Sequence, residues 1–297
     1  MYPIIFEYNN FQISTYGFML MLAFLICNYL LKKYLVSINI DRQHGENIIF
    51  YAALGGIIGA KIFYIIEYYP TGEGYANLQG LFDMISGIIR FNFNLFLNGL
   101  KNFGSGLVFL GGLVGGMMSV SIYVYKNKLS WPIVADWVAP YIILGQGIGR
   151  LGCFCVGCCY GIPSNKNWLF TFPYGRPPTT YESFKYNYPD IFVNFVEPFY
   201  KAGDFIKVHP TQLYEFILYL LIFFYLLYKR KHKKYNGQII CEYLLLSGLS
   251  RFIIEIYRLN PVYIINLTSA QIISIFMIAI SFITIINKSQ YIRIWKK

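Results

Sequence analysis

The sequence predicts an all-α membrane protein that crosses the bilayer about seven times and carries one small insert outside it. Its 297 residues are 56% hydrophobic and only 13% charged, which is too little polar surface for a soluble fold of this length. Apolar stretches of about 20 residues recur along the chain, and each is long enough to span a bilayer. The net charge is +11, and the basic residues that produce it lie mainly between these stretches. This distribution is typical of loops that set membrane topology, so we expect no nucleic-acid partner.

Seven stretches have the length and composition of transmembrane helices, and we expect them to form a single domain over residues 1–297. The predicted spans are Phe11–Leu31, Asn47–Tyr68, Gly106–Tyr125, Trp131–Arg150, Pro210–Tyr228, Ile239–Tyr257 and Val262–Ile286. The first ten residues contain Glu7 and no basic stretch, so we expect no cleaved signal peptide.

Basic residues set the expected orientation of these spans. They concentrate in the short loops after the first, third and fifth spans and in the tail after the seventh, and the densest tract is K-R-K-H-K-K at 229–234. Short loops that are rich in Lys and Arg face the cytoplasm. We therefore expect the N-terminus outside and the C-terminus inside.

Two segments between the spans are expected outside the bilayer core. Leu81–Leu100 is apolar but interrupted by Asp83, Arg90 and several asparagines, so we expect it to lie along the outer interface. The 161–208 insert is rich in Tyr, Pro and Asn, and we expect an extracytoplasmic cap there. It is too short to bury much of a core alone.

Ionisable side chains gather at one predicted depth, the outer half of the bilayer. At about 1.5 Å per helical residue, the spans place six charged groups there, together with Tyr16 and His209. The charged groups are Lys61, Arg150, Glu215, Arg251, Glu255 and Arg258. The last three share one face of the sixth span, because they are spaced i, i+4, i+7.

This set carries net positive charge within the membrane, which indicates a binding site for a phosphate. A phosphate at this depth belongs naturally to a phospholipid headgroup of the outer leaflet, so we expect an anionic phospholipid as partner. The alternative is that the three charges of the sixth span only compensate one another on the helix surface. That alternative leaves Lys61 and Arg150 without assigned partners, and Glu215 is the expected partner of one of them.

Six stretches occur in the order found in prolipoprotein diacylglyceryl transferases, and the chain resembles that family over residues 14–258. The central one, G-R-L-G-C-F-C-V-G-C-C-Y-G at 149–161, is similar to the family signature G-R-[IL]-G-N-F-x-N-G-E-x-x-G. The others are S-T-Y-G-F-M-L at 14–20, G-G-I-I-G-A-K-I-F-Y at 55–64, F-L-G-G-L-V-G-G at 109–116, H-P-T-Q-L-Y-E at 209–215 and R-F-I-I-E-I-Y-R at 251–258.

The resemblance implies an enzyme of the bacterial cytoplasmic (inner) membrane that needs no cofactor. Such an enzyme moves the diacylglyceryl group of phosphatidylglycerol to the lipobox cysteine that follows a prolipoprotein signal peptide. By motif match, Arg150 and Arg251 hold the phosphate, because arginine offers bidentate donors to the charge that develops on the leaving group. Tyr16 lines the site, Glu255 and its neighbouring arginine orient these groups, and Lys61 stands where the family usually carries arginine.

Four positions depart from the family pattern. The histidine of the family's F-H-G-G box, a proposed base for the thiol, is Leu110 here. The signature's asparagine and glutamate are replaced by Cys153 and Cys158, and a tyrosine four residues before the sixth-span arginine is Ser247. His209 is the remaining histidine on the outer side, and its ordinary pKa of about 6.5 suits a base. The other interpretation of His209 is capping or packing.

The cysteines support a second hypothesis, a membrane thiol oxidoreductase or a carrier of thiol or sulfur species. Cys153, Cys155, Cys158 and Cys159 are close in sequence, and Cys155 and Cys158 form a C-x-x-C pair on the expected oxidising side. The same pair suits a structural disulfide after the fourth span. Because the sequence holds no second C-x-x-C or H-x-x-H, it does not predict a metal site.

A channel or transporter is the third hypothesis, and it needs ionisable groups throughout the bilayer depth. The inner thirds of the predicted spans are largely apolar. Asp136 is the main exception, and we expect it at the inner surface. This asymmetry favours a lipid-facing site at the outer leaflet.

Overall fold

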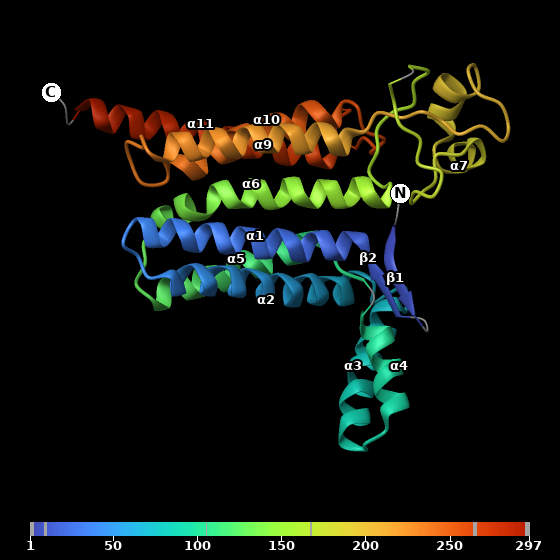
Figure 1. The fold of residues 1–297 in the computed structure, drawn as a ribbon, viewed down its shortest axis with the longest axis horizontal. Coiled ribbons are helices and arrows are strands. Elements are labelled where there is room, and N and C mark those ends of the chain that lie inside the picture. Colours follow the sequence, from blue (N-terminus) through green and yellow to red (C-terminus); the bar gives the residue numbers. More distant parts are fainter. Residues whose placement is uncertain (1–2, 9–10, 105, 167, 264–265, 295–297) are drawn as a thin grey trace. The chain divides into compact units, whose positions relative to one another are not determined.

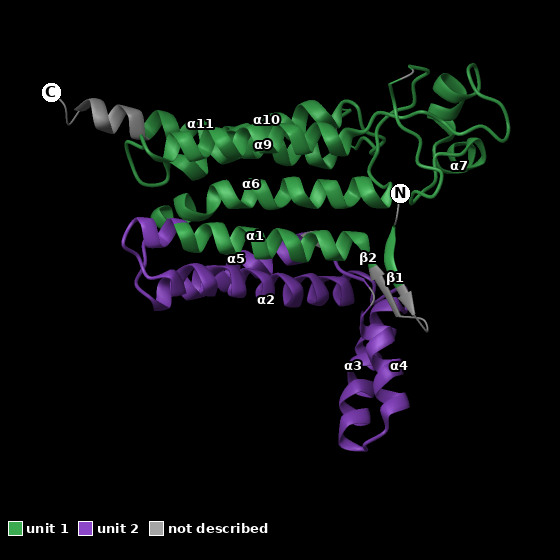
Figure 2. Cartoon of the chain, in the orientation of Figure 1, with its two compact units in different colours: residues 1–33, 132–297 green, residues 34–131 purple. Residues whose placement is uncertain are grey.

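The computed structural model describes residues 3–8, 11–104, 106–166, 168–263 and 266–294. These residues are mostly helical, and the one sheet among them is a two-stranded hairpin. The predicted all-α polytopic architecture is confirmed. The chain divides into two compact units, one of residues 1–33 with 132–297 and the other of residues 34–131 (Figure 2). The single continuous domain expected from the sequence stays a prediction.

The first unit holds the N-terminal hairpin, α1 and the elements after residue 131 (Figure 1). Its elements are β1 (Ile4–Tyr8), β2 (Phe11–Ser14), α1 (Thr15–Ser37, its end in the other unit), α6 (Trp131–Val156), α7 (Tyr181–Asn187), α8 (Pro189–Ile191), the π-helix η1 (Phe192–Val196), α9 (Thr211–Arg230), α10 (Gln238–Glu255) and α11 (Ser269–Ile294). The strands pair antiparallel, and helix α10 packs against both α9 and α11.

The second unit is helical throughout its described residues. Its elements are α2 (Arg42–Glu67), α3 (Glu73–Ile89), α4 (Phe93–Gly104) and α5 (Phe109–Lys126). Helix α2 packs against α5, and α3 packs against α4 in a helical hairpin that runs across the direction of α2 (Figure 1). The segment Leu81–Leu100 therefore forms parts of two helices, and its place at the membrane interface stays a prediction.

Glycines set the spacing of the helix pairs in the second unit. A Cβ added at Gly59 of α2 would lie 2.8 Å from the Cα of Gly115 and would overlap the carbonyl oxygen of Gly111, both in α5. Between α3 and α4, a Cβ at Gly80 would lie 2.8 Å from the backbone nitrogen of Phe103. Small residues let the backbones of membrane helices approach closely, so these contacts suit a membrane setting.

Five of the described helices are long and apolar enough to cross a membrane. They are α1, α2, α6, α9 and α11 as far as Asn287. They coincide with the predicted first, second, fourth, fifth and seventh spans. Helices α5 and α10, of 18 residues each, occupy the predicted third and sixth spans, and their crossing of the membrane stays a prediction.

The predicted starts of the first and seventh spans are wrong. Phe11–Ser14 forms strand β2, because its alternating apolar and polar residues pair with β1, and α1 begins only at Thr15. The last span was expected from Val262, but α11 begins at Ser269, after a loop whose residues 264–265 lie outside the described part. The hydroxyl oxygen of Thr268 accepts a hydrogen bond from a backbone N–H of the first turn, at 3.2 Å, and thereby caps the helix.

Two predicted helix ends are also wrong. Helix α6 continues past Arg150 to Val156, so Arg150 lies inside the helix, and the chain turns only at Gly157, whose φ is +73°. Helix α10 ends at Glu255, and Arg258 lies beyond the helix, in a bridge with Gly161. Hydrophobicity alone did not reveal these ends, because apolar residues continue through both.

The 161–208 insert buries a small core. The buried side chains are Tyr160, Phe172, Phe184, Phe192, Val196, Ile206 and Val208. Phe154 of α6 packs edge-to-face on Phe172 with ring centroids 5.7 Å apart. The insert does not build this core alone, as expected, because the end of α6 supplies one wall of it.

Candidate functional site

A buried carboxylate, Glu215 of α9, lies at the centre of an ion-pair network in the first unit. One oxygen of Glu215 pairs with Arg150 of α6, and the other pairs with Arg251 of α10. Arg258 approaches the same carboxylate, with its Nη1 4.0 Å from Oε1. The expected pairing of Glu215 with Arg150 is thus present, and three helices contribute to one cluster.

A second buried carboxylate, Glu255, extends this network. Its Oε2 lies 2.9 Å from Nη2 of Arg251 and 3.7 Å from Nε of Arg258. Its Oε1 accepts hydrogen bonds from Asn260 at 2.6 Å and from Thr268 at 2.9 Å. The three charges of the predicted sixth span therefore do not form a separate surface triad, because they are joined to Glu215 in the interior.

The three arginines of this network differ in how much of each side chain is exposed. The side chains of Arg150 and Arg251 are 22% and 20% exposed, whereas Glu215 between them has no exposure. Arg258 is 7% exposed, and its Nε and Nη1 atoms have no hydrogen-bond partner among the described residues. The guanidiniums of Arg150 and Arg251 are thus paired with one buried carboxylate, while part of each side chain stays exposed.

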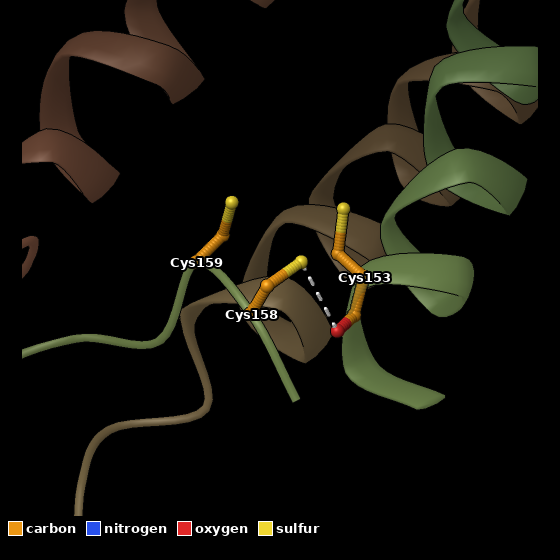
Figure 3. Close-up of side chains that lie close together, drawn as sticks. All are labelled: Cys153, Cys158 and Cys159. Carbon is orange, nitrogen blue, oxygen red and sulfur yellow. Dashed lines mark hydrogen bonds between the residues drawn. The ribbon is translucent and has the colours of Figure 1, made fainter. Parts of the chain in front are cut away.

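Three cysteines gather next to this network. The sulfur atoms of Cys153, Cys158 and Cys159 all lie within 4.8 Å of one another (Figure 3). The guanidinium of Arg258 lies within electrostatic range of Cys159. Cys155, the other member of the C-x-x-C pair, is not part of this group. All six cysteines are unpaired in the structure, and a disulfide after the fourth span stays a prediction.

The start of α9 holds the cysteine loop in place. Gln212 donates to the carbonyl oxygen of Cys158 at 2.6 Å, and Thr211 donates to that of Cys159 at 2.8 Å. Both donors are fully buried. Neither residue stands out in the sequence, although both belong to the H-P-T-Q-L-Y-E motif. Their role is to fix the backbone that carries the thiols.

His209 precedes α9 within a group of aromatic rings. Its Nδ1 lies 3.2 Å from the hydroxyl of Tyr214, and its ring packs against Trp168 and Tyr257 at centroid distances of 5.7 and 5.5 Å. Burial, and then the positive charge of Lys166, lower the pKa of His209 below its ordinary value. The imidazole is therefore neutral at pH 7, the form in which it accepts a proton.

Tyr16 lies on α1 at the contact with α6. A Cβ added at Gly152 would come within 3.3 Å of the Tyr16 ring, and the hydroxyl lies within electrostatic range of Cys153 and Arg150. The structure therefore brings Tyr16 to the cysteine side of the network.

Lys61 and Leu110 belong to the second unit, and Ser247 belongs to the first. The ammonium group of Lys61 hydrogen-bonds Asn77, lies 3.3 Å from the carbonyl oxygen of Gly106 and stacks over aromatic rings. Leu110 is exposed on α5, and Ser247 is buried within α10. Neither side chain replaces the histidine or tyrosine that the resemblance implies.

Asp136 is not the surface residue expected from the sequence. Its side chain is 1% exposed, and its carboxylate accepts hydrogen bonds from the backbone N–H groups of Gly237 and Ile239, at 2.8 and 2.9 Å. It therefore caps the N-terminus of α10, and Lys233 lies 3.5 Å away. This role explains an acidic residue in an apolar span without a transport pathway.

Comparisons with known proteins show to which family the chain belongs. Residues 3–287 match the family described as prolipoprotein diacylglyceryl transferase. The chain is 33% identical over 284 residues to the phosphatidylglycerol–prolipoprotein diacylglyceryl transferase of Clostridium tetani, with 94% of this chain and 95% of that protein covered. It is 30% identical over 293 residues to the protein of the same name from Clostridium botulinum, with 97% of each covered. The chain belongs to the prolipoprotein diacylglyceryl transferase family.

Proposed function

We propose that this protein transfers the diacylglyceryl group of phosphatidylglycerol to the thiol of the lipobox cysteine in prolipoproteins, within the bacterial cytoplasmic membrane. The names of the relatives supply the reaction. The observation that carries the proposal is the pair of partly exposed arginine side chains, Arg150 and Arg251, whose guanidiniums both pair with the buried carboxylate of Glu215.

This trio suits the phosphate of one phospholipid. Two guanidiniums against one carboxylate leave one positive charge in excess, which matches the single negative charge of a phosphodiester. Because Glu215 fixes both side chains, little side-chain entropy is lost when the phosphate binds. Arginine also donates in pairs to phosphate oxygens, so the site favours a phosphate over a simple halide.

The same donors act in the bond-breaking step. The sulfur of the lipobox cysteine attacks, as a thiolate, the glycerol carbon that carries the phosphate ester. A C–S bond forms, the C–O bond breaks, and glycerol phosphate leaves with the electron pair. Negative charge grows on the phosphate as it leaves, and donors already in position stabilise that charge most in the transition state.

A cavity beside Glu255 is a suitable binding site for a glycerol headgroup. Its volume is about 240 Å³, and its described lining includes Glu255, Asn260 and Thr268. These side chains offer hydrogen-bonding atoms close to the arginines, which suits the two free hydroxyls of a phosphatidylglycerol headgroup. We propose that the headgroup enters here and that glycerol phosphate departs from here.

The proposed base for the lipobox thiol is His209, because Leu110 replaces the histidine of the family motif. Its lowered pKa keeps the ring neutral and ready to accept a proton at pH 7. Tyr16 is proposed to line the thiol side of the site, since it lies next to Cys153 and Arg150. A role of Lys61 in binding the phospholipid stays a prediction from the sequence.

A complementation experiment tests the transferase proposal. The chain is expressed in bacteria depleted of their own transferase, and lipidation of a reporter prolipoprotein is followed by its mobility shift. The wild-type chain should restore lipidation, and Arg150→Ala should abolish it. Arg230→Ala is the matched control, because Arg230 lies at the other end of α9 and contacts Tyr141. If the wild-type chain is inserted and expressed but restores no lipidation, the proposal is wrong.

A further inference from the structure

We propose that Cys153, Cys158 and Cys159 bind one zinc ion and that the open fourth position of this ion takes the thiol of the substrate. The proposal that zinc binds is argued only from the arrangement of the three cysteines. The second half of the proposal, activation of the substrate thiol, rests on the transferase function proposed above.

The three sulfur atoms are already close to the spacing that zinc requires. They lie within 4.8 Å of one another. With Zn–S bonds of about 2.3 Å, tetrahedral geometry separates two sulfur ligands by about 3.8 Å. A contraction of about 1 Å therefore completes the site, and rotation of the thiol side chains supplies it without a change of fold.

The backbone is shaped to bring the thiols together. The N–H groups of Gly157 and Cys158 both donate to the carbonyl oxygen of Cys153, at 3.0 and 3.1 Å, so the chain folds back over the end of α6. Cys159 has a φ of +62°, a left-handed conformation that is uncommon for a residue with a Cβ. The hydrogen bonds from Thr211 and Gln212 to the neighbouring carbonyls maintain this conformation.

The ligand set selects a soft cation. Thiolates bind zinc and similar metals in preference to magnesium or calcium. Zinc sites that act in catalysis have three protein ligands and one open position. Three thiolates and Zn²⁺ together carry one negative charge, and Arg258, which lies within electrostatic range of Cys159, places a positive charge beside them.

The position of the cluster suits activation of a thiol. Cys153 lies within electrostatic range of Arg150, so the proposed zinc and the proposed phosphate contact are neighbours in the first unit. A thiol that coordinates zinc is deprotonated, because the metal lowers its pKa. The released proton passes to water or to His209. The bound sulfur then forms the C–S bond as the C–O bond to the phosphate breaks, and no oxidant or reductant is consumed.

Metal analysis of the purified full chain tests the proposal. Zinc per chain is measured by mass spectrometry for the wild type, for Cys153→Ser, Cys158→Ser and Cys159→Ser, and for the control Cys155→Ser. Wild type and control should hold about one zinc each. Loss of a ligand should weaken binding by about tenfold or more against a chelator. Cobalt in place of zinc should give a sulfur-to-metal absorption band in the wild type and in the control.

The possible outcomes separate this proposal from the transferase proposal. A metal-free wild type, zinc retained by all three ligand variants, or a disulfide in place of free thiols each overturns the zinc site. Full lipidation activity after zinc removal, with zinc binding intact beforehand, overturns only the activation step. Zinc bound at the cluster in a chain that never lipidates a prolipoprotein overturns the transferase proposal and leaves the metal site standing. Thermal unfolding of each variant shows whether it is folded.

Discussion

At the scale of single residues, Glu215 determines where the guanidiniums of Arg150 and Arg251 lie. It is fully buried and pairs with guanidiniums from two other helices. Without a carboxylate between them, Arg150 and Arg251 would repel each other and turn towards solvent. Removal of one partner from a buried ion pair typically costs about 3–5 kcal/mol, because an uncompensated charge is left behind. Glu215 therefore positions the phosphate-binding residues and does not itself need to touch the phospholipid.

Replacing Arg251 with lysine tests the geometry of this site separately from its charge. Lysine keeps the positive charge but cannot bridge Glu215 and Glu255 with a planar fork of donors. A hydrogen bond to a charged group contributes about 1.5–3 kcal/mol, so lipidation should slow by about ten- to hundredfold. Initial rates with phosphatidylglycerol vesicles measure the effect. A rate equal to wild type would show that charge alone is sufficient at this position.

The proposed role of His209 as a base predicts how the lipidation rate depends on pH. Because its pKa is lowered below the ordinary value of about 6.5, the ring is neutral at pH 7 and becomes protonated only in more acidic solution. Lipidation should therefore be level near neutrality and fall as the pH drops through the lowered pKa. His209→Asn should lose this acid limb, and its rate at pH 7 should fall by about a hundredfold or more. An unchanged pH profile in the variant would assign His209 to packing.

At the scale of elements, close approach of glycines holds α2 against α5. A Cβ at Gly59 would overlap the backbone of α5, whereas a Cβ at Gly17 of α1 would meet nothing within 4 Å. Gly59→Ala should therefore lower the free energy of unfolding by about 1–3 kcal/mol. Gly17→Ala should raise it by about 0.5–1 kcal/mol, because alanine favours the helix. Thermal unfolding of both variants in the same detergent measures the difference, and equal effects would contradict the observed packing.

The turn after α6 explains why the spacing of the cysteines along the chain did not predict their cluster. The sequence draws attention to Cys155 and Cys158, because they have C-x-x-C spacing. In the structure, Cys155 lies within α6, whereas Cys158 follows the turn at Gly157. The turn returns the chain towards Cys153 and creates a cluster from residues five and six positions apart. Spacing rules for a continuous helix or strand do not describe such a turn.

At the scale of the whole molecule, orientation in the membrane follows from the distribution of basic residues. The tract at 229–234 and the C-terminal tail should both lie in the cytoplasm, and the 161–208 insert should lie outside. A green fluorescent protein fused after Lys297 should therefore fluoresce. Alkaline phosphatase inserted at Gly203, an exposed turn of the insert, should be active. The opposite pattern would place the ion-pair network at the cytoplasmic leaflet and would contradict the proposed encounter with prolipoproteins.

The sequence by itself determined the membrane class, the positions of the long apolar helices and the family, because these depend on composition and on ordered local motifs. It also identified Arg150, Glu215 and Arg251 as charges within apolar segments. Only the tertiary structure decided that Glu215 pairs with both arginines, that α6 extends beyond Arg150 and that three cysteines meet beside Arg258. Those features depend on where separate helices and a reversed chain come together in space, and neither hydropathy nor the spacing of residues along the chain contains that information.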